Sequence, residues 1–384
     1  MLVLKNCRLA NDEVYDIKIE DSKIIQIVKN IDCSDVSSVI DVNEAYVLAG
    51  IVDLNVSLKD NMLSMSHISR LQQKALRSGI TSFALMPNFE PMANNATFME
   101  LLNEIIESSS PVVLGVKAVD EDRLYNISRL INKGAEFIQE SSSISSNLIR
   151  RILQYSNMKS VPFFCFCDDP SLNDDGVMNE GDISAKLGLL GISKVGEISS
   201  VARVCAMAEY YQSKVLFQSL SLSKSLDIIN KAKSNNPNLY TEVSIHHLIL
   251  NDSACLDFNT TSKIHPPLRD EKERLMLIED LKSGKIDTIT SLHSPKSIVY
   301  KDVPFADAAY GIDAMENFLS ICYRSLVESG IISLSKLSEM ISFNPAKILG
   351  LKNIGKVEEG YIADLVIFDP KEAKILNTVC KGVV

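Results

Sequence analysis

The chain has 384 residues, of which 46% are hydrophobic, and its formal net charge is -10. This length suits one barrel of about 250 residues with an accessory domain, or two average domains, and the apolar content is ample for a large core. The acidic balance argues against a nucleic-acid partner, and the lack of a run of about 18 apolar residues argues against a membrane span.

The start of the chain and its cysteines indicate the compartment. Residues 1–16, MLVLKNCRLANDEVYD, become charged too early for a signal peptide. The eight cysteines are scattered along the chain rather than spaced as a disulfide framework. We therefore expect reduced cysteines and a cytoplasmic protein.

The two ends of the chain are typical of strands. Residues 1–45 alternate apolar and polar side chains around turn-like Asn-Asp and Asp-Ser pairs, which predicts short antiparallel strands. Residues 360–370, GYIADLVIFDP, are also typical of a strand. We therefore expect β-structure at both ends.

Between the ends, strand-like and helix-like stretches alternate. Helices are predicted over His67–Ser78 and Leu334–Leu349, and Asn344-Pro345 is predicted to start a helix, because proline fits the first turn. The predicted strands are 50–55, 80–86, 111–116, 136–139, 161–167, 214–217, 239–245 and 285–291. Eight alternations favour an α/β fold with a closed (β/α)8 TIM-type barrel, over residues 49–350, rather than an open sheet.

Three stretches resemble the dihydroorotase branch of the amidohydrolase superfamily. Residues 46–60, YVLAGIVDLNVSLKD, resemble its first barrel strand, PG-hydrophobic-D-x-H-V-H-L-R. TEVSIHHL resembles E-V-x-P-H-H-L, and KIHPPLRDEKERLMLIEDLKSGKID resembles a long motif that begins K-x-N-P-P-L-R. The resemblance implies the metallo-dependent hydrolase fold, with a small β-sandwich domain formed by both chain ends, residues 1–48 and 351–384.

The same resemblance identifies the positions where relatives bind catalytic zinc. In the family, histidines and one aspartate at the strand ends hold the metal. Serine and asparagine are weak neutral ligands, and phenylalanine and leucine are not ligands at all. We therefore predict no metal ligand, no catalytic residue and no cofactor in this chain, because the matching positions hold Asn55, Ser57, Phe166, Ser219 and Leu292.

Four further positions are candidates for substrate binding. Lys59 stands where the family has an arginine that holds a substrate carboxylate. Asn88, in MPNFEP, matches an asparagine that contacts the same carboxylate, although asparagine is also a good turn residue there. His265 replaces a family asparagine, and His293 is retained next to Leu292.

Other groups near the strand ends have alternative readings. His246 and His247 match family histidines that support the structure near the site, and Lys296 stands for the second histidine of the family motif A-T-D-H-A-P-H. Glu140 is the one acid at the fourth strand end. A new metal site made by Cys165, Cys167 and Asp168 is disfavoured, because both cysteines face away from Phe166 on a strand.

These positions predict a dihydroorotase-like protein of pyrimidine biosynthesis that has lost hydrolysis. A bound metal makes hydroxide from water in such sites, and no Ser/His/Asp arrangement replaces it here. The resemblance to catalytically inactive dihydroorotases implies a structural partner of aspartate carbamoyltransferase, or a homo-oligomer. Two alternatives stay open: an active cyclic amide hydrolase with an altered site that uses His293, Asp168 or Glu140, and a sensor that binds a pyrimidine-like acid through Lys59 and Asn88.

Overall fold

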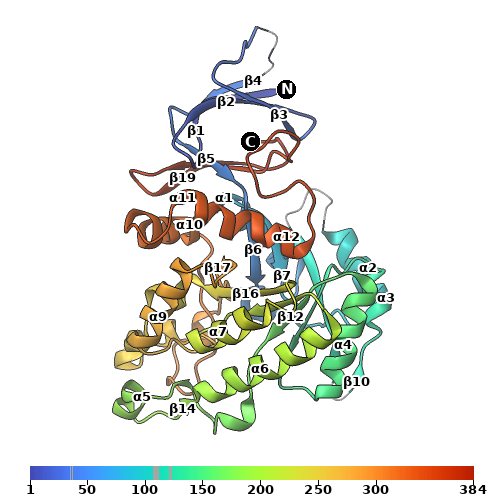
Figure 1. Cartoon of the computed structure of the whole chain (residues 1–384), viewed down its shortest axis with the longest axis vertical. Coiled ribbons are helices and arrows are strands. Elements are labelled where there is room, and N and C mark those ends of the chain that lie inside the picture. The colour runs from blue at the N-terminus through green and yellow to red at the C-terminus, as the bar shows by residue number, and fades with distance from the viewer. Residues whose placement is uncertain (35, 37, 107–111, 121–122) are drawn as a thin grey trace.

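The computed structural model describes residues 1–34, 36, 38–106, 112–120 and 123–384. A sheet domain that contains both chain ends lies above a barrel of strands and surrounding helices (Figure 1). The chain starts in the sheet domain, passes through the whole barrel and returns to the sheet domain at its end.

Eight parallel strands of the described chain form the barrel, which confirms the predicted fold class. Their order is β17-β16-β15-β12-β11-β8-β7-β6. An isolated parallel bridge from Val56 to His293 joins the first strand to the segment after the last and nearly closes the ring. The third predicted strand starts at Pro111, which lies outside the described residues. The strand bounds are β6 (Ile51–Val56), β7 (Ile80–Leu85), β8 (Val112–Lys117), β11 (Phe137–Ser141), β12 (Phe163–Phe166), β15 (Val215–Gln218), β16 (Leu239–Ser244) and β17 (Thr288–Thr290).

The barrel strands read as apolar runs because both of their faces are buried. All six residues of β7 are buried, for example. Inside the barrel the rings of Phe137 and Phe164 stack with centroids 4.4 Å apart, and outside it the helices pack on the strands. The longer helices of this layer are α1 (Met65–Arg77), α2 (Ala96–Ile105), α4 (Ser146–Lys159), α6 (Lys194–Tyr211), α7 (Ser223–Ala232) and α9 (Glu271–Lys282).

The predicted helix over 334–349 forms as three successive helical segments. They are α11 (Leu334–Ser338), a π-helical turn η7 (Glu339–Phe343) and α12 (Asn344–Leu349). Pro345 lies in the first turn of α12, as predicted, but Phe343 before it is already helical. The wider π turn directly precedes the proline, which has no N–H to donate into the helix.

The sheet domain joins the two ends of the chain. Its strands are β1 (Leu2–Arg8), β2 (Val14–Glu20), β3 (Lys23–Val28), β4 (Ser38–Asp41), β5 (Tyr46–Ala49), β18 (Leu365–Asp369) and β19 (Lys374–Val379). β1, β2 and β3 pair antiparallel as predicted, whereas β4 and β5 pair with β1 in parallel. β18 pairs antiparallel with β5 and places the C-terminal strands in the same sheet as the N-terminal ones.

Gly50 separates the sheet domain from the barrel, between β5 and β6. A Cβ atom at Gly50 would lie 2.2 Å from Oγ1 of Thr81, so only glycine permits this approach of the two segments. Its N–H donates to the carbonyl of Asp364 at 2.7 Å. The connection is therefore short and tightly packed.

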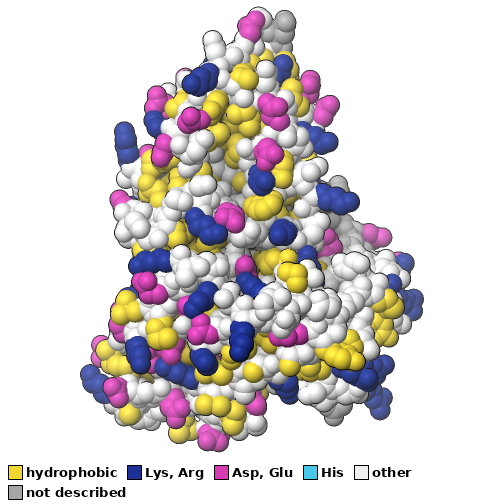
Figure 2. Space-filling model, in the orientation of Figure 1, with side chains coloured by type: hydrophobic (Ala, Val, Ile, Leu, Met, Phe, Trp, Pro, Cys, Tyr) yellow, Lys and Arg dark blue, Asp and Glu magenta, His cyan; other side chains and the backbone are white. Residues whose placement is uncertain are grey.

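Charged side chains of both signs are spread over the surface. On the face shown in Figure 2, basic and acidic side chains are interspersed rather than gathered into one patch. Over the described ranges, the helices are too short or too polar for any of them to cross a bilayer.

Candidate functional site

A cavity of about 270 Å³ lies at the C-terminal ends of the barrel strands. This end of a (β/α)8 barrel is where active sites form, because the loops that follow the strands converge there. Most of the side chains that line it are neutral amides, hydroxyls and apolar groups. The described lining consists of Asn55, Ser57, Asn61, Met86, Asn88, Gln139, Phe166, Gln218, Ser219, Ile264, His265, Leu292, Ser294, Lys296, Tyr310 and Gly311.

Asn55 at the end of β6 is held in a buried polar cluster. Its Nδ2 donates to Oγ of Ser219 at 2.9 Å and to Oε1 of Glu242 at 3.0 Å. The backbone N–H of Ser219 donates to the same Oε1 at 3.1 Å. The amide of Asn55 is thus occupied by side chains of two other strand ends.

Glu242 lies beneath the cavity and is fully buried. Burial, opposed by the hydrogen bond from Asn55, raises the pKa of this carboxyl to about 8. Its Oε2 atom has no hydrogen-bond partner within the described part of the chain. Glu242 is therefore largely a neutral acid at pH 7.

Ser57 and Leu292 occupy the opposite part of the mouth. Oγ of Ser57 accepts a hydrogen bond from Nδ2 of Asn88 at 3.0 Å, and the N–H of Ser57 donates to the carbonyl of His293. Leu292 packs in an apolar cluster with Ile264. Asn88 therefore does contact a group of the mouth, while Leu292 contributes only apolar surface.

His265 forms the centre of an aromatic group at the rim. The centroid of its ring lies 5.1 Å from that of Phe166 and 5.1 Å from that of Tyr310. Nε2 of His265 lies 3.2 Å from Oδ2 of Asp168, and its Nδ1 is buried without a partner among the described residues. Burial tends to raise the pKa of Asp168, but the hydrogen bond and charge of His265 outweigh it and lower that pKa.

Lys296 and Lys59, the two lysines considered from the sequence, lie in different places relative to the cavity. Lys296 lines the cavity and its Nζ donates to Oδ1 of Asn61 at 3.0 Å, while burial lowers its pKa. Lys59 lies in the turn η1 (Lys59–Asn61), is exposed, and does not belong to the described lining. The lysine that faces the cavity is therefore Lys296.

His293 lies behind the cavity wall rather than in it. It is 1% exposed, and its Nδ1 accepts a hydrogen bond from the N–H of Ala314 at 3.3 Å. Burial lowers the pKa of His293 to about 4, so the ring is neutral at pH 7. Of the four substrate-binding candidates, the structure brings Asn88 and His265 to the cavity and leaves Lys59 and His293 outside its described lining.

Glu140, Cys165 and Cys167, which were considered from the sequence, do not belong to the described lining of the cavity. Glu140 is 4% exposed, and its carboxylate accepts hydrogen bonds from the N–H groups of Val119 and Ser141, so that Gln139 faces the cavity. Cys165 and Cys167 belong to the core between strands and helices, with their sulfur atoms 3.9 Å apart. Their direction matches the predicted alternation along the strand.

The retained histidine pair lies in α8 (Ile245–Ile249) and is structural. Nε2 of His246 lies 3.2 Å from the carbonyl of Ser291, and Nε2 of His247 lies 3.1 Å from that of Pro266. Burial lowers the pKa of these rings to about 4 and about 3, respectively. Both rings are neutral and hold the segments around the mouth together.

The donor set of the mouth does not fit zinc. Zinc sites in proteins use imidazole, thiolate and carboxylate ligands, usually three or four of them. The described lining contains one imidazole, His265, and no carboxylate or thiol. Across the part of the chain that the structure describes, no three His, Cys, Asp or Glu side chains come together as a ligand group.

Tyr310 and Glu242 are among the residues of the site that were not predicted from the sequence. Tyr310 follows a long irregular segment without any motif, so no sequence signal points to it. The sequence did contain a signal for Glu242, because an acid within a buried strand such as β16 must lie on one of the two buried faces of that strand. Period-two alternation places it on the same side as Tyr240 and Ser244.

Comparisons with known proteins agree with this architecture. A family model described as "Dihydro-orotase-like" matches residues 45–221, and one described as "Amidohydrolase family" matches residues 225–384. The L-hydantoinase (dihydropyrimidinase) of Arthrobacter aurescens has a similar structure, with a TM-score of 0.86 and 20% identity, covering 96% of this chain and 86% of that one. At 20% identity this similarity shows a shared fold only.

Sequence relatives are more specific. A dihydroorotase of Acetivibrio thermocellus is 33% identical over 372 residues, which cover 95% of this chain and 87% of the relative. A dihydroorotase of a Thermoanaerobacter species is 33% identical over 376 residues, which cover 96% and 86%. With this similarity over nearly its whole length, the chain belongs to the dihydroorotase family of the amidohydrolase superfamily.

Proposed function

We propose that this dihydroorotase-family protein does not hydrolyse dihydroorotate through a bound metal and acts as a structural partner of aspartate carbamoyltransferase. The observation that supports the first part is the described lining of the mouth, which offers one imidazole and no carboxylate. Phe166 and Leu292 provide carbon atoms where a ligand set needs electron pairs.

Hydrolysis of a cyclic amide needs a strong nucleophile at neutral pH. A bound ion supplies one in such barrels by lowering the pKa of water from 15.7 to about 7. Here Asn55 is hydrogen-bonded to Ser219 and Glu242, and the raised pKa of Glu242 keeps that acid largely protonated. The residues therefore support a barrel without this source of hydroxide.

A direct test measures metal and turnover on the same preparation. We expect substoichiometric zinc by mass spectrometry of the purified protein and no dihydroorotate hydrolysis above the uncatalysed rate. The dihydroorotase of Acetivibrio thermocellus, purified in parallel, is the positive control. Stoichiometric zinc together with chelator-sensitive turnover would refute the proposal.

The partnership is tested separately. A protein whose cavity performs no hydrolysis is retained for its contacts, and the resemblance to inactive dihydroorotases points to the transferase. We expect the aspartate carbamoyltransferase of the same organism to elute with this chain in size-exclusion chromatography, and to lose assembly or activity without it. A transferase that assembles and works fully alone would contradict this role.

A second candidate is a cyclic amide hydrolase with an altered site. The similarity to proteins described as dihydroorotases favours it, and so does the pair of Asp168 and His265 at the rim. Asp168 orients the ring through Nε2, which leaves Nδ1 of His265 to take a proton from a water that attacks the amide carbonyl. This hydrolysis would persist in chelator and fall by about 100-fold or more in His265→Gln.

A further inference from the structure

An exposed apolar surface borders the mouth of the barrel, at the end of the molecule away from the sheet domain (Figure 1). We call it the rim patch, and its six large side chains are each between 49% and 72% exposed. They are Met62, Met65, Phe258, Ile298, Val299 and Tyr300. Single exposed apolar residues are common on soluble proteins, but a group of this size in one place marks an interaction surface.

Hydrogen bonds tie the segment of Met62 to turn η5 (Ile298–Tyr300). The turn begins directly after Ser297, whose N–H donates to Oδ1 of Asp60 at 2.6 Å and whose hydroxyl donates to Oδ2. Met62 follows Asp60 by two residues, and Met65 starts α1 three residues later. The two methionines and the start of η5 are therefore held close to one another.

A second set of hydrogen bonds holds the other end of η5 to the segment of Phe258. Oγ1 of Thr260 donates to the carbonyl of Lys301 at 2.6 Å, and Nζ of Lys301 donates to the carbonyl of Thr260 at 2.9 Å. Phe258 lies two residues before Thr260, and Lys301 directly follows η5. The rim patch is therefore a preformed surface drawn from three segments of the chain.

Turn η5 has no buried residue, although its three residues are isoleucine, valine and tyrosine. Hydrophobic stabilisation scales with the apolar area that is removed from water, so folding of a single chain gains little from these side chains. Only a contact with another molecule would remove this area from water.

Two charged side chains lie at opposite ends of η5. Lys59 directly precedes Asp60 beside the start of the turn, and Asp302 follows the end of the turn, where its N–H donates to the carbonyl of Ile298 at 2.7 Å. Both residues are exposed. Over the described ranges, neither side chain makes a hydrogen bond or an ion pair with another residue. The rim patch therefore offers one cation and one anion to another molecule.

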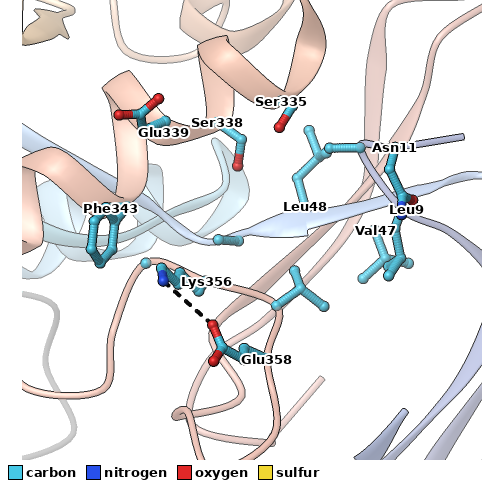
Figure 3. Close-up of a pocket in the computed structure, with 14 residues that line it drawn as sticks. Leu9, Asn11, Val47, Leu48, Ser335, Ser338, Glu339, Phe343, Lys356 and Glu358 are labelled. Atoms are coloured by element: carbon cyan, nitrogen blue, oxygen red, sulfur yellow. Dashed lines mark hydrogen bonds and ion pairs between the residues drawn. The ribbon is translucent and has the colours of Figure 1, made fainter. Parts of the chain in front are cut away.

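The opposite end of the barrel differs in this respect. A pocket of about 370 Å³ lies there, between the barrel and the sheet domain (Figure 3). Glu358 of this pocket lies 3.4 Å from Nζ of Lys356, and Glu339 lies 3.0 Å from Nζ of Lys336. Its carboxylates already have partners, whereas the charges beside the rim patch do not.

The arrangement of the rim patch is self-complementary. A two-fold axis through the middle of η5, perpendicular to the patch, exchanges the two ends of the turn, so Lys59 of one copy meets Asp302 of the other. The reverse pair forms at the same time. Six large side chains that are about half exposed present on the order of 600 Å². With the surrounding polar residues, this area approaches the roughly 800 Å² that each partner contributes to a stable interface.

We propose that the rim patch is a two-fold interface between two copies of this chain. Ile298 and Val299 of both copies pack at the axis, and two pairs of Lys59 with Asp302 flank it. The mouth of each barrel lies beside this interface, because Lys296 of the cavity lining precedes Ile298 by two residues. This dimer depends neither on the absence of hydrolysis nor on the transferase.

The test is sedimentation-velocity ultracentrifugation of the full-length protein from about 1 µM to about 100 µM. In about 0.15 M salt the Debye length of about 8 Å screens the net charge of -10. We expect the mass to rise from that of one chain to that of two, with a dissociation constant on the order of 10 µM. The double variant Ile298→Asp with Val299→Asp should raise this constant by about 100-fold, because it places charges in the apolar centre of the interface.

Charge reversal tests the two-fold arrangement itself. Lys59→Glu alone and Asp302→Lys alone each bring like charges together twice, so each variant should dimerise about tenfold more weakly. An equimolar mixture of the two variants should recover the affinity of the unaltered protein, because both pairs then join opposite charges again. A mixture that dimerises no better than either variant alone would overturn the proposal.

Met158→Asp is the matched control, because Met158 on α4 is 60% exposed, as is Met65 of the rim patch. It should leave the mass distribution unchanged, and the exposed positions of all these substitutions should leave the thermal unfolding temperature nearly constant. The proposal fails if the protein stays monomeric at the highest concentration, or if the dimer persists in the double aspartate variant. It also fails if the chain stays a monomer and binds the transferase through the rim patch, because a different partner then covers it.

Discussion

The mouth of the barrel and the layer behind it use polar residues in opposite ways. Behind the mouth, Arg269 and Glu197 are each 4% exposed and form a buried ion pair with a 3.8 Å separation. At the mouth, the lining consists of neutral groups apart from Lys296 and the titratable rings of His265 and Tyr310. The difference teaches that the buried Arg269–Glu197 pair behind the mouth does not depend on the residues that line the mouth. The fold can therefore keep its buried ion pair while the side chains of the mouth change.

The largest loss of stability is expected for Arg269→Ala. Besides the ion pair, Nε of Arg269 donates to Oγ of Ser221 at 2.9 Å and Nη1 donates to the carbonyl of Ile192 at 3.1 Å. Removing the arginine leaves Glu197 buried and unpaired, so we expect the free energy of unfolding to fall by about 3–5 kcal/mol. Urea denaturation measures it.

Arg274→Ala is the control for that experiment. Arg274 pairs with Glu271 at 2.6 Å, but the side chain of Glu271 is 49% exposed. A surface pair contributes about 0–1 kcal/mol, and the hydrogen bond from Nη1 of Arg274 to the carbonyl of Leu248, at 3.0 Å, adds about 0.5–1.5 kcal/mol. If both arginine variants lose the same stability, the contrast between the two layers is wrong.

Glu242 lies between the two layers and predicts a pH dependence. Its folded-state pKa of about 8 is above the ordinary 4.5, so between these values the folded protein holds a proton that the unfolded chain has released. The stabilisation is complete below pH 4.5 and is lost as the pH rises through 8. Between pH 6.5 and pH 8 we expect Glu242 to cost about 1.5 kcal/mol of unfolding free energy.

Glu242→Gln should remove this loss. Urea denaturation of both proteins at several pH values measures the difference in slope, and Glu279→Gln serves as an exposed control. Parallel slopes for the unaltered protein and Glu242→Gln would show that the acid is ionised throughout.

The smallest effect is expected at the mouth itself. Asn88→Ala removes one hydrogen bond, to Ser57, from an exposed residue, so we expect a loss of about 0.5 kcal/mol. Thermal unfolding of the variant measures it. A loss as large as that of Arg269→Ala would mean that the mouth, too, is an essential part of the supporting network.

The fold was predictable because its signals are local and repeated. The barrel strands are apolar runs separated by helical stretches, and the structure contains a strand at each predicted place. The parallel pairing of β4 and β5 with β1 was not predictable from alternation, since alternation does not encode the direction of the partner strand. The π-helical turn before Pro345 likewise depends on packing around that proline.

The site was less predictable for a physical reason. Sequence motifs show which residues lie near a strand end, but they fix the register only to within about one residue. An error of one residue changes which side chain faces the cavity, because neighbouring side chains of a strand point to opposite faces. Gln139 rather than Glu140 faces the cavity, and Lys296 rather than Lys59 brings the ammonium group. Tyr310 reaches the rim from a long loop, so its position depends on tertiary contacts that no local pattern records.

The sheet domain also has a consequence for synthesis of the chain. β5 leaves the ribosome early, but its antiparallel partner β18 follows only after the entire barrel has been translated. Until then an edge of β5 lacks its partner strand, and such edges pair readily with other chains. Loss of the last strands by truncation or premature termination would make that exposure permanent and would favour aggregation of an otherwise complete barrel.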